Sequence, residues 1–530
     1  MVMPFENITG DRSLDPLGRL AADWISQGLL QIEHIEVVSG SVGAEPAAGA
    51  VPAGDAARAR ANGNRAGTVI VGAYYPNGTD LEMHGRLIET GGGKVLYAAE
   101  PARCPRIAPM ECVDRVRQRL MGAVVTQFDL PEYTGVIQKP PLYEAYKEYM
   151  VGLEAHGIDL PKALAHFERA VQLDPDFMIA QIRLASAYCN VKEWVKAEAL
   201  FTNLRASAER MTLAERLFLD LIDAMYHGRL VETYQAAKKL HALVPVDSII
   251  TWQVAENALL TGRPREALAV LGDITPLLAQ SGRLRQISWW VTTATRAHHF
   301  LGEHEAELVV ARKGLETFPD MLSMHAAVAQ ALAALGRVDE LDQALDAALA
   351  VPSGRLNPGY VLVVAADELR VHGHPEASPR LARRAVDWYR GQPPAQLEEE
   401  SVALGLVRAL CAAGLWDDAR SAASRVAEAV PGSIGARGYL GLSAAHMGDR
   451  VEARKMLQWL ETAEDLDDRG SPTLWRARIT AQMGEKEQAI VLLREAFRQG
   501  QSLIVRTHAD RELDPLRAET AFQDLVKPKG

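Results

Sequence analysis

The 530-residue chain has no apolar run near the roughly 18 residues that a membrane-spanning helix requires. Its amino terminus has neither the basic segment nor the long apolar stretch of a signal peptide. These two absences predict a protein without a membrane segment and favour the cytoplasm as its location.

Cysteine is scarce. Cys104, Cys112, Cys189 and Cys411 fit no zinc-ligand spacing, and four cysteines in so long a chain do not make a disulfide framework. We therefore expect buried small side chains or incidental thiols at these positions.

The chain also lacks an excess of positive charge. Its net charge is −11, whereas binding to nucleic acid or to an anionic membrane requires clustered Lys and Arg. We expect protein or peptide partners and no nucleic acid.

Motifs for phosphate chemistry are missing as well. The run Gly91-Gly92-Gly93-Lys94 lacks the spacing and the following Ser or Thr of a phosphate-binding loop, and it fits a hairpin turn better. No other stretch has the lysine strand, catalytic loop or metal-binding loop of a kinase. The sequence predicts no enzyme and no cofactor.

What the chain has is a repeated helical pattern, clearest from Lys162 to Phe177. Apolar residues recur there at helical spacing, and Asp174-Pro175 ends the helix because a residue before proline is driven out of the α region. A single hairpin of this size cannot bury its own apolar face, so copies are expected beside it.

Copies of the hairpin recur along the chain at a regular interval. Turn residues between paired helices stand at Ile158, Lys192, Gly228, Gly262, Gly302, Gly336, Gly373, Gly414, Gly448 and Gly484. They define ten hairpins from about residue 142 to residue 499, and the wider spacings before Gly302 and Gly414 predict longer loops or helices there. The usual interval of about 34 residues, with two helices per unit, is the tetratricopeptide period.

The residues of the repeats resemble the tetratricopeptide family. The matches to its pattern are Ala163, Phe167, Ala170 and Pro175 in the first repeat, Leu184, Ala185, Tyr188, Ala197 and Phe201 in the second, and Gly441, Ala453, Ala489 and Ala496 in later ones. The resemblance implies an α-solenoid whose concave face binds a protein or peptide.

Residues 1–130 differ in kind. Short strands are expected at the amino terminus, at His34–Val38 and in a meander covering Thr68–Tyr75, Asp80–Thr90 and Lys94–Ala99, with amphipathic helices at Leu17–Leu30 and Met110–Phe128 and a short helix at Asp55–Ala61. This order predicts a small α/β domain. The fold class is thus mainly α, a solenoid of about ten hairpins preceded by an α/β domain.

This first domain resembles the amino-terminal domain of the translocation protein TolB. The resemblance is carried by Pro4–Asp11, Leu17, Ala22, Val71-Gly72 and Arg86–Ile88. Similar domains stand between the effector domain of bacterial serine/threonine kinases or related signalling proteins and a tetratricopeptide array. The resemblance therefore implies a role in bacterial signalling.

No effector domain precedes Pro4, and Met1 falls inside what should be the first strand. We interpret the chain as one that lost its effector half or whose start lies further upstream. The alternative function is the sensory or regulatory half of a kinase or cyclase whose catalytic domain is missing. In a membrane-anchored relative, this region would lie on the extracytoplasmic side.

Two groups of histidines lie at expected turns: His298, His299 and His304 around Gly302, and His372 and His374 beside Gly373. A metal would require convergent ligands and supporting carboxylates. Glu303 and Glu305 are equally expected on a solvated turn, so we expect no metal site at either group.

The first helix of each hairpin lines the groove in the tetratricopeptide family. Mapping that pattern here gives the candidate partner-binding residues Phe218, Ile222, Tyr226, Trp252, Trp289, Arg296 and His299. Aromatic residues and arginine dominate interface energetics. Packing between repeats is the alternative for the aromatic residues, Trp252 above all, and a solvated charge is the alternative for Arg296 and Arg408.

The chain is thus expected to contain the α/β domain (1–130), a linker (131–141), the repeat array (142–500) and a capping helix (501–530) that starts at Asp514-Pro515. The favoured function is a non-enzymatic scaffold for protein binding.

Overall fold

The computed structural model describes residues 1–32, 35–38, 57–58, 61–128, 139–156, 159–245, 248–272, 284–353, 356–463, 469–502 and 507–529. The chain divides into two compact units, Met1–Leu219 and Asp220–Gly530. The expected linker at 131–141, the turn residue Ile158 and the helix at Asp55–Ala61 lie wholly or largely outside the described residues. Among the residues described, no helix is both long and apolar enough to span a membrane.

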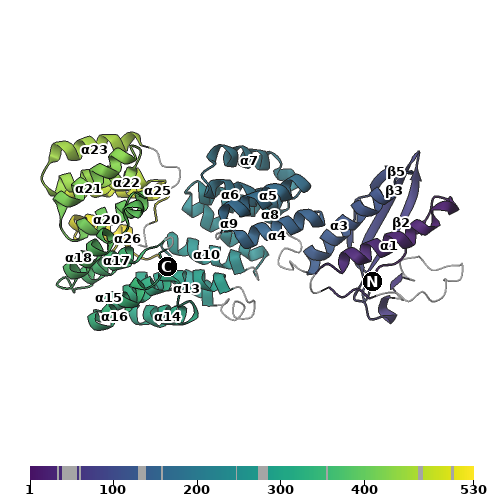
Figure 1. Ribbon diagram of the computed structural model, residues 1–530, viewed down its shortest axis with the longest axis horizontal. Coiled ribbons are helices and arrows are strands. Elements are labelled where there is room, and N and C mark those ends of the chain that lie inside the picture. Colours follow the sequence, from purple (N-terminus) through teal and green to yellow (C-terminus); the bar gives the residue numbers. More distant parts are fainter. Residues whose placement is uncertain are drawn as a thin grey trace. The chain divides into compact units, whose positions relative to one another are not determined.

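The first unit begins with a five-stranded sheet (Figure 1). Its strands are β1 (Glu6–Asn7), β2 (Thr68–Asn77), β3 (Asp80–Glu89), β4 (Val95–Ala98) and β5 (Ala102–Pro105). The sheet order is β1-β2-β3-β4, with β5 also paired to β3. The pairing of Asn77 with Asp80 leaves a two-residue loop in which Gly78 has a φ of +62°, as expected for a hairpin.

Two strand predictions need correction. Residues 35–38 form no strand, because the edge of β2 where a strand would add is taken by the amino terminus, through the Val2–Ile70 bridge and β1. The short strand β5 was not predicted, since its four residues end in proline and lack an apolar run.

Two helices, α1 (Asp15–Leu29) and α3 (Met110–Phe128), pack on one face of this sheet. Ile25 of α1 and Leu120 of α3 share a buried cluster with Tyr74, Leu81 and Met83 of the sheet. Their apolar residues recur at helical spacing, which is why the sequence predicted both helices.

Cys104 at the end of the sheet and Cys112 on α3 form a disulfide bond. The expectation of incidental thiols is wrong for this pair, and their side chains meet because β5 runs back under α3. Cys189 and Cys411 are buried thiols outside this disulfide, as expected.

Helical hairpins follow, in consecutive pairs (Figure 1). The pairs in the first unit are α4 (Tyr143–Ala155) with α5 (Leu160–Leu173) and α6 (Met178–Asn190) with α7 (Trp194–Ala206). Helix α8 (Leu213–Tyr226) crosses into the second unit and precedes α9 (Leu230–Leu243). The expected hairpin architecture is confirmed.

The second unit continues with α10 (Ser248–Leu260) and α11 (Pro264–Gly272), α13 (Leu284–Leu301) and α14 (His304–Thr317), α15 (Leu322–Ala334) and α16 (Val338–Leu349), α17 (Pro358–Val371) and α18 (Ser378–Arg390), α20 (Glu400–Ala412) and α21 (Trp416–Ala429), α22 (Ile434–His446) and α23 (Arg450–Thr462), and α24 (Ser471–Gln482) and α25 (Lys486–Arg498). The additional helix α19 (Pro394–Leu397) explains the longer spacing between turn residues before Gly414. The length of α13, 18 residues, contributes to the longer spacing before Gly302.

The turn residues behave as the repeat predicts. All eight turn glycines have positive φ, and so does Lys192, which stands where the other repeats have glycine. A left-handed conformation costs a non-glycine residue roughly 1–2 kcal/mol, so the repeat position dictates the conformation of Lys192 against its own preference.

Replacing Lys192 with glycine should therefore stabilise the protein. We expect a gain of about 0.5–1 kcal/mol in the free energy of unfolding, because the relief of strain exceeds the added entropy of the unfolded chain. The reverse change, Gly448→Ala, should cost about 1 kcal/mol, since Gly448 has a φ of +78° and open space around it. Denaturant midpoints measure both, and an unchanged or lowered midpoint for Lys192→Gly would show that other contacts of Lys192 matter more.

The chain ends in a 3₁₀ helix, η4 (Arg511–Leu516), and a short helix, α26 (Thr520–Val526). The last helix thus begins later than the predicted Asp514-Pro515, and Pro515 lies inside the 3₁₀ helix instead. Leu513, Leu516 and Phe522 are buried against α24 and α25.

Candidate functional site

The candidate site lies on the first helices of the hairpins in the Asp220–Gly530 unit. We call this surface the first-helix face, and residues 507–516 the groove segment. The groove segment contacts residues of four first helices, α13, α17, α22 and α24. A surface predicted to bind a peptide therefore holds a piece of its own chain.

Two side chains of the face bind the backbone of the groove segment. Arg370 on α17 donates a hydrogen bond of 3.0 Å to the carbonyl of Ala509, and Gln482 on α24 donates one of 2.9 Å to the carbonyl of Glu512. Such bonds depend on an available carbonyl and not on the side chain of that residue, so they do not require a particular sequence in the bound segment.

Ion pairs hold the side chains of the segment. Arg478 on α24 lies 2.7 Å from Asp510, whose side chain is only 8% exposed, and Arg370 pairs with Asp514. Arg511 of the segment reaches back to Asp367 on α17 at 3.4 Å. Charges this buried are costly to leave unpaired, so they fix the register of the segment on the face.

Asp367 shows the electrostatic character of the face. Burial raises the pKa of its carboxyl group, and the cations Arg408 and Arg511 oppose that shift. Arg408 lies 3.2 Å from Asp367 and its guanidinium lies over the ring of Tyr360. The alternative interpretation of Arg408 as a solvated charge is therefore wrong.

A second acid of the segment, Glu512, is held at the end of α22. Burial raises the pKa of Glu512, while His446, 3.2 Å away, lowers it. The ring of His446 stacks on Trp416 with centroids 3.7 Å apart. The segment thus has a contact with α22 as well as with α17 and α24.

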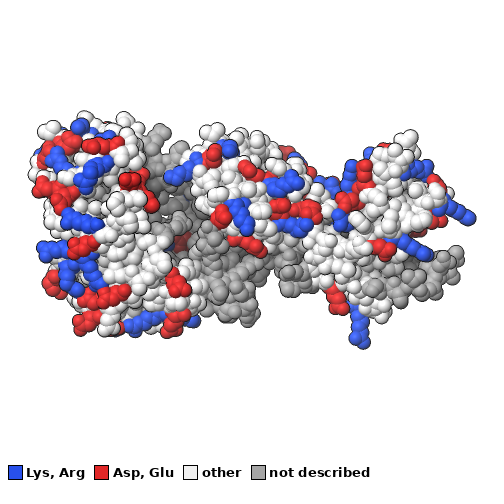
Figure 2. Space-filling model, viewed as in Figure 1, with Lys and Arg blue, Asp and Glu red and all other residues white. Residues whose placement is uncertain are grey.

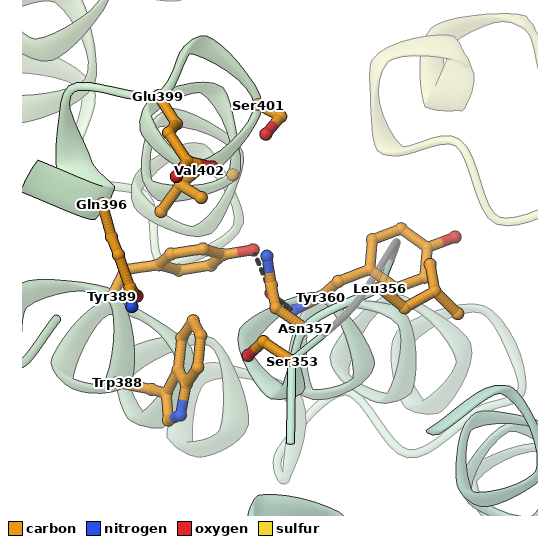
Figure 3. Close-up of a pocket in the computed structure, with 11 residues that line it drawn as sticks. Ser353, Leu356, Asn357, Tyr360, Trp388, Tyr389, Gln396, Glu399, Ser401 and Val402 are labelled. Carbon is orange, nitrogen blue, oxygen red and sulfur yellow. Dashed lines mark hydrogen bonds between the residues drawn. The ribbon is translucent and has the colours of Figure 1, made fainter. Parts of the chain in front are cut away.

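Cavities remain beside the segment. One of about 520 Å³ is lined by the face and the segment together, including Tyr360, Arg408, Tyr439, Trp475 and Asp510. A second cavity, of about 460 Å³, is also lined by Tyr360 but by no residue of the segment, and it lies between α17, α18 and α20. Figure 3 shows Trp388, Tyr389 and Asn357 around it, where the hydroxyl of Tyr389 donates a 2.9 Å hydrogen bond to Asn357.

Of the predicted partner-binding residues, Trp252 on α10 and Trp289 and Arg296 on α13 lie together. The two indole rings are 5.0 Å apart, and the indole N–H of Trp252 donates to Thr293 at 3.1 Å. Arg296 pairs with Glu256 at 2.7 Å. All three side chains are half-buried, so they combine packing with an accessible edge.

The other predicted residues are placed differently. Phe218, Ile222 and His299 are buried, and the ring of Phe218 lies under the guanidinium of Arg183 at 4.7 Å. The Tyr226 carbonyl accepts a hydrogen bond from Arg469. The sequence pattern could not separate the buried positions on these helices from the accessible ones.

The two predicted histidine groups come together in part. His299, His304 and His372 have their rings 4.6–5.7 Å apart, and His508 of the groove segment joins them. His298 turns to Glu303 instead, and His374 lies over Gly336. Burial alone would lower the pKa of His299, but Glu307 and Glu368 outweigh it and raise the pKa to about 10.

Sequence reasoning missed Asp367, Glu368, Arg370, Arg478 and the acids of the groove segment. One signal could have found the first four: these charged residues lie on the first helices of their hairpins, the helices that line the groove in the tetratricopeptide pattern. The acid cluster Asp510, Glu512 and Asp514 near the chain end was the complementary signal.

No protein-family model and no curated protein sequence matches the chain. Solved structures match at low identity. A tetratricopeptide repeat protein from Parabacteroides merdae is 14% identical over 57% of this chain and 98% of its own, with a TM-score of 0.30. Yeast Tom70 is 12% identical over 75% and 95%, with a TM-score of 0.32. Human IFIT1, solved as a dimer with m7Gppp-AAAA, is 14% identical over 64% and 81%, with a TM-score of 0.30. TM-scores this low do not establish a shared overall arrangement.

Proposed function

We propose that this chain is a non-enzymatic scaffold that binds a protein or peptide segment along its first-helix face. The observation that supports this most is the groove segment, which is held by its backbone carbonyls and by its acidic side chains at the same time. A face that holds one acidic segment in this way has the chemistry to hold another of similar kind.

A protein partner suits the surface better than nucleic acid. The net charge is −11, and the groove segment presents acids to arginines that a phosphate backbone would have to displace. Figure 2 shows Lys and Arg interspersed with Asp and Glu on the face in view, without a broad basic patch there. Phosphate contacts require such a patch.

The proposed contact residues for the partner are Tyr226, Trp252, Trp289 and Arg296, on the part of the first-helix face that precedes the groove segment's contacts. Half-buried tryptophans combine a large apolar area with few rotatable bonds, which is why they dominate interface energies. Phe218, Ile222 and His299 would contribute by packing, since they are buried.

Changing Trp289 to alanine should weaken partner binding by more than about 2 kcal/mol, or roughly 30-fold. The full-length chain serves as bait in native lysate, and recovered proteins are identified by mass spectrometry. We expect a small set of proteins that wild-type chain recovers and the Trp289→Ala chain loses, with little change in melting temperature.

The matched control is Trp24→Ala, which removes a tryptophan that is 40% exposed on α1. It should leave capture unchanged. If Trp289→Ala recovers the same proteins as wild type, the proposed contact surface is wrong. If instead its melting temperature collapses, Trp289 belongs to the core.

A place in bacterial signalling, a TolB-like identity for the α/β domain and a cytoplasmic location are further parts of this proposal. They rest on the sequence resemblance and on the absence of targeting signals in the sequence.

A further inference from the structure

Three imidazoles and one carboxylate converge at one end of the groove segment. His299 comes from α13, Glu368 and His372 come from α17, and His508 comes from the segment itself. His299 and His508 are 209 residues apart in the sequence. One ligand atom from each of the four nevertheless lies within 4.8 Å of all the others. Glu368 and His299 are buried, with side chains 3% and 4% exposed.

The three distances from the Glu368 oxygen match those of a tetrahedral metal site. The Oε2 atom of Glu368 lies 3.3 Å from Nε2 of His299, 3.4 Å from that of His372 and 3.1 Å from that of His508. Zinc bonds of about 2.0–2.1 Å in a tetrahedron place neighbouring ligand atoms about 3.3 Å apart. The separation between the Nε2 atoms of His299 and His508, 2.8 Å, is somewhat shorter.

The imidazole nitrogens that face Glu368 can hold either protons or a metal ion. Nδ1 of His299 faces Glu307 at 2.8 Å and donates to it, which leaves Nε2 of His299 directed at the Glu368 carboxylate 3.3 Å away. Nε2 of His372 is buried 3.4 Å from Glu368, and among the described residues it has no hydrogen bond of acceptable geometry. Lone pairs that face one another in a buried site require either added protons or a metal ion between them.

A supporting carboxylate is also present. Glu307, whose side chain is 1% exposed, accepts from Nδ1 of His299 and lies 3.1 Å from Nδ1 of His304. Metal-bound histidines usually donate their second N–H to a carboxylate in this way, which orients the ring and makes the ligand more basic.

We propose that His299, His372, His508 and Glu368 form a binding site for a divalent transition-metal ion, with Zn²⁺ the best fit. Three imidazole nitrogens and one carboxylate oxygen at tetrahedral spacing suit zinc, whereas magnesium and calcium prefer oxygen ligands. Glu307 orients His299 from outside the ligand set. Because His508 belongs to the groove segment, the metal would tie that segment to α13 and α17.

The test uses the full-length chain, stripped of metal with a chelator and then titrated with Co²⁺ and Zn²⁺. Co²⁺ reports its own geometry, because a tetrahedral ion absorbs visible light far more strongly than an octahedral one. We expect one equivalent of Co²⁺ with the tetrahedral spectrum, displaced by one equivalent of Zn²⁺ in competition with a chelating dye.

Two single substitutions test whether the proposed ligands bind the metal. His372→Gln and His508→Gln should each lower the affinity for Zn²⁺ by more than about 100-fold, beyond the 10–100-fold typical of an outer-shell change. Both side chains are about one-quarter exposed, so the fold should tolerate their loss better than that of Glu368. The control is His166→Gln, which removes a histidine that pairs with Glu148 at 2.6 Å in the Met1–Leu219 unit and belongs to neither the cluster nor the groove segment's contacts.

The control should keep the spectrum and the affinity of wild type. The proposal is overturned if wild type binds no stoichiometric ion, if the Co²⁺ spectrum is octahedral, or if His372→Gln and His508→Gln bind as tightly as His166→Gln. In that case the cluster is held together by protons on its histidines.

Discussion

Replacing Arg478 with methionine should lower the free energy of unfolding of the Asp220–Gly530 unit by about 3–5 kcal/mol. Arg478 is the partner of Asp510 at 2.7 Å, and the Asp510 side chain is only 8% exposed. Methionine retains much of the apolar contact with Trp475 but leaves the carboxylate buried without its countercharge. Denaturant unfolding followed by circular dichroism measures the change.

Two controls isolate the cause. Arg498 and Glu495 form an ion pair at the same 2.7 Å distance, but their side chains are 76% and 36% exposed. Arg498→Met should therefore cost less than about 1 kcal/mol. Adding Asp510→Asn to Arg478→Met should recover much of the loss, because it removes the unpaired charge. If Arg478→Met and Arg498→Met lower the free energy of unfolding equally, the burial of the groove segment is contradicted.

Ending the chain after residue 502 should destabilise the second unit by several kcal/mol and cause aggregation. The removed part includes Leu513, Leu516 and Phe522, which are at most 3% exposed and pack against α24 and α25. Full burial of each such side chain contributes about 1.5–3 kcal/mol. Analytical ultracentrifugation and melting temperature report the two effects.

A chain ended after residue 526 is the matched control. It keeps all three apolar side chains, so it should remain soluble with nearly the stability of wild type. A soluble, monomeric chain ended at residue 502 would show that the predicted capping role of residues 501–530 is wrong.

The hairpins were predictable because their cause is local. A regular repeat interval and a turn residue between two apolar faces specify each hairpin without knowledge of its neighbours. Lys192 illustrates how strong this determination is: the repeat position predicted its turn, and it adopts the left-handed conformation that glycine adopts elsewhere. The hairpin turn at Gly78 was predictable for the same reason.

The groove segment was not predictable, because nothing local to residues 507–516 encodes where they pack. Its acids Asp510 and Asp514 find Arg478 and Arg370, which are 32 and 144 residues away. The sequence pattern predicted an apolar capping helix and located it too early. The pairing of charges across such separations depends on how the first helices align.

The histidine cluster was not predicted, for a related reason. Each histidine group was judged alone, beside its own turn, where solvated glutamates were the expected neighbours. The structure instead combines His299 and His372, from hairpins that are not adjacent, with His508. The buried Glu368 that joins them carries no signature in sequence, since glutamate in a helix is usually exposed.

Amide hydrogen exchange of the full-length chain tests most directly whether the first-helix face holds the groove segment. Within η4 and just after it, the amides of Leu513 and Arg517 are hydrogen-bonded to Asp510 and Asp514, and the segment is anchored by Arg478. We expect these two amides to exchange nearly as slowly as those of α24 in the wild-type chain. We also expect them to exchange faster in the Arg478→Met chain than in the Arg498→Met chain. Exchange at the rate of an unstructured peptide in wild type would show that the face does not hold the segment.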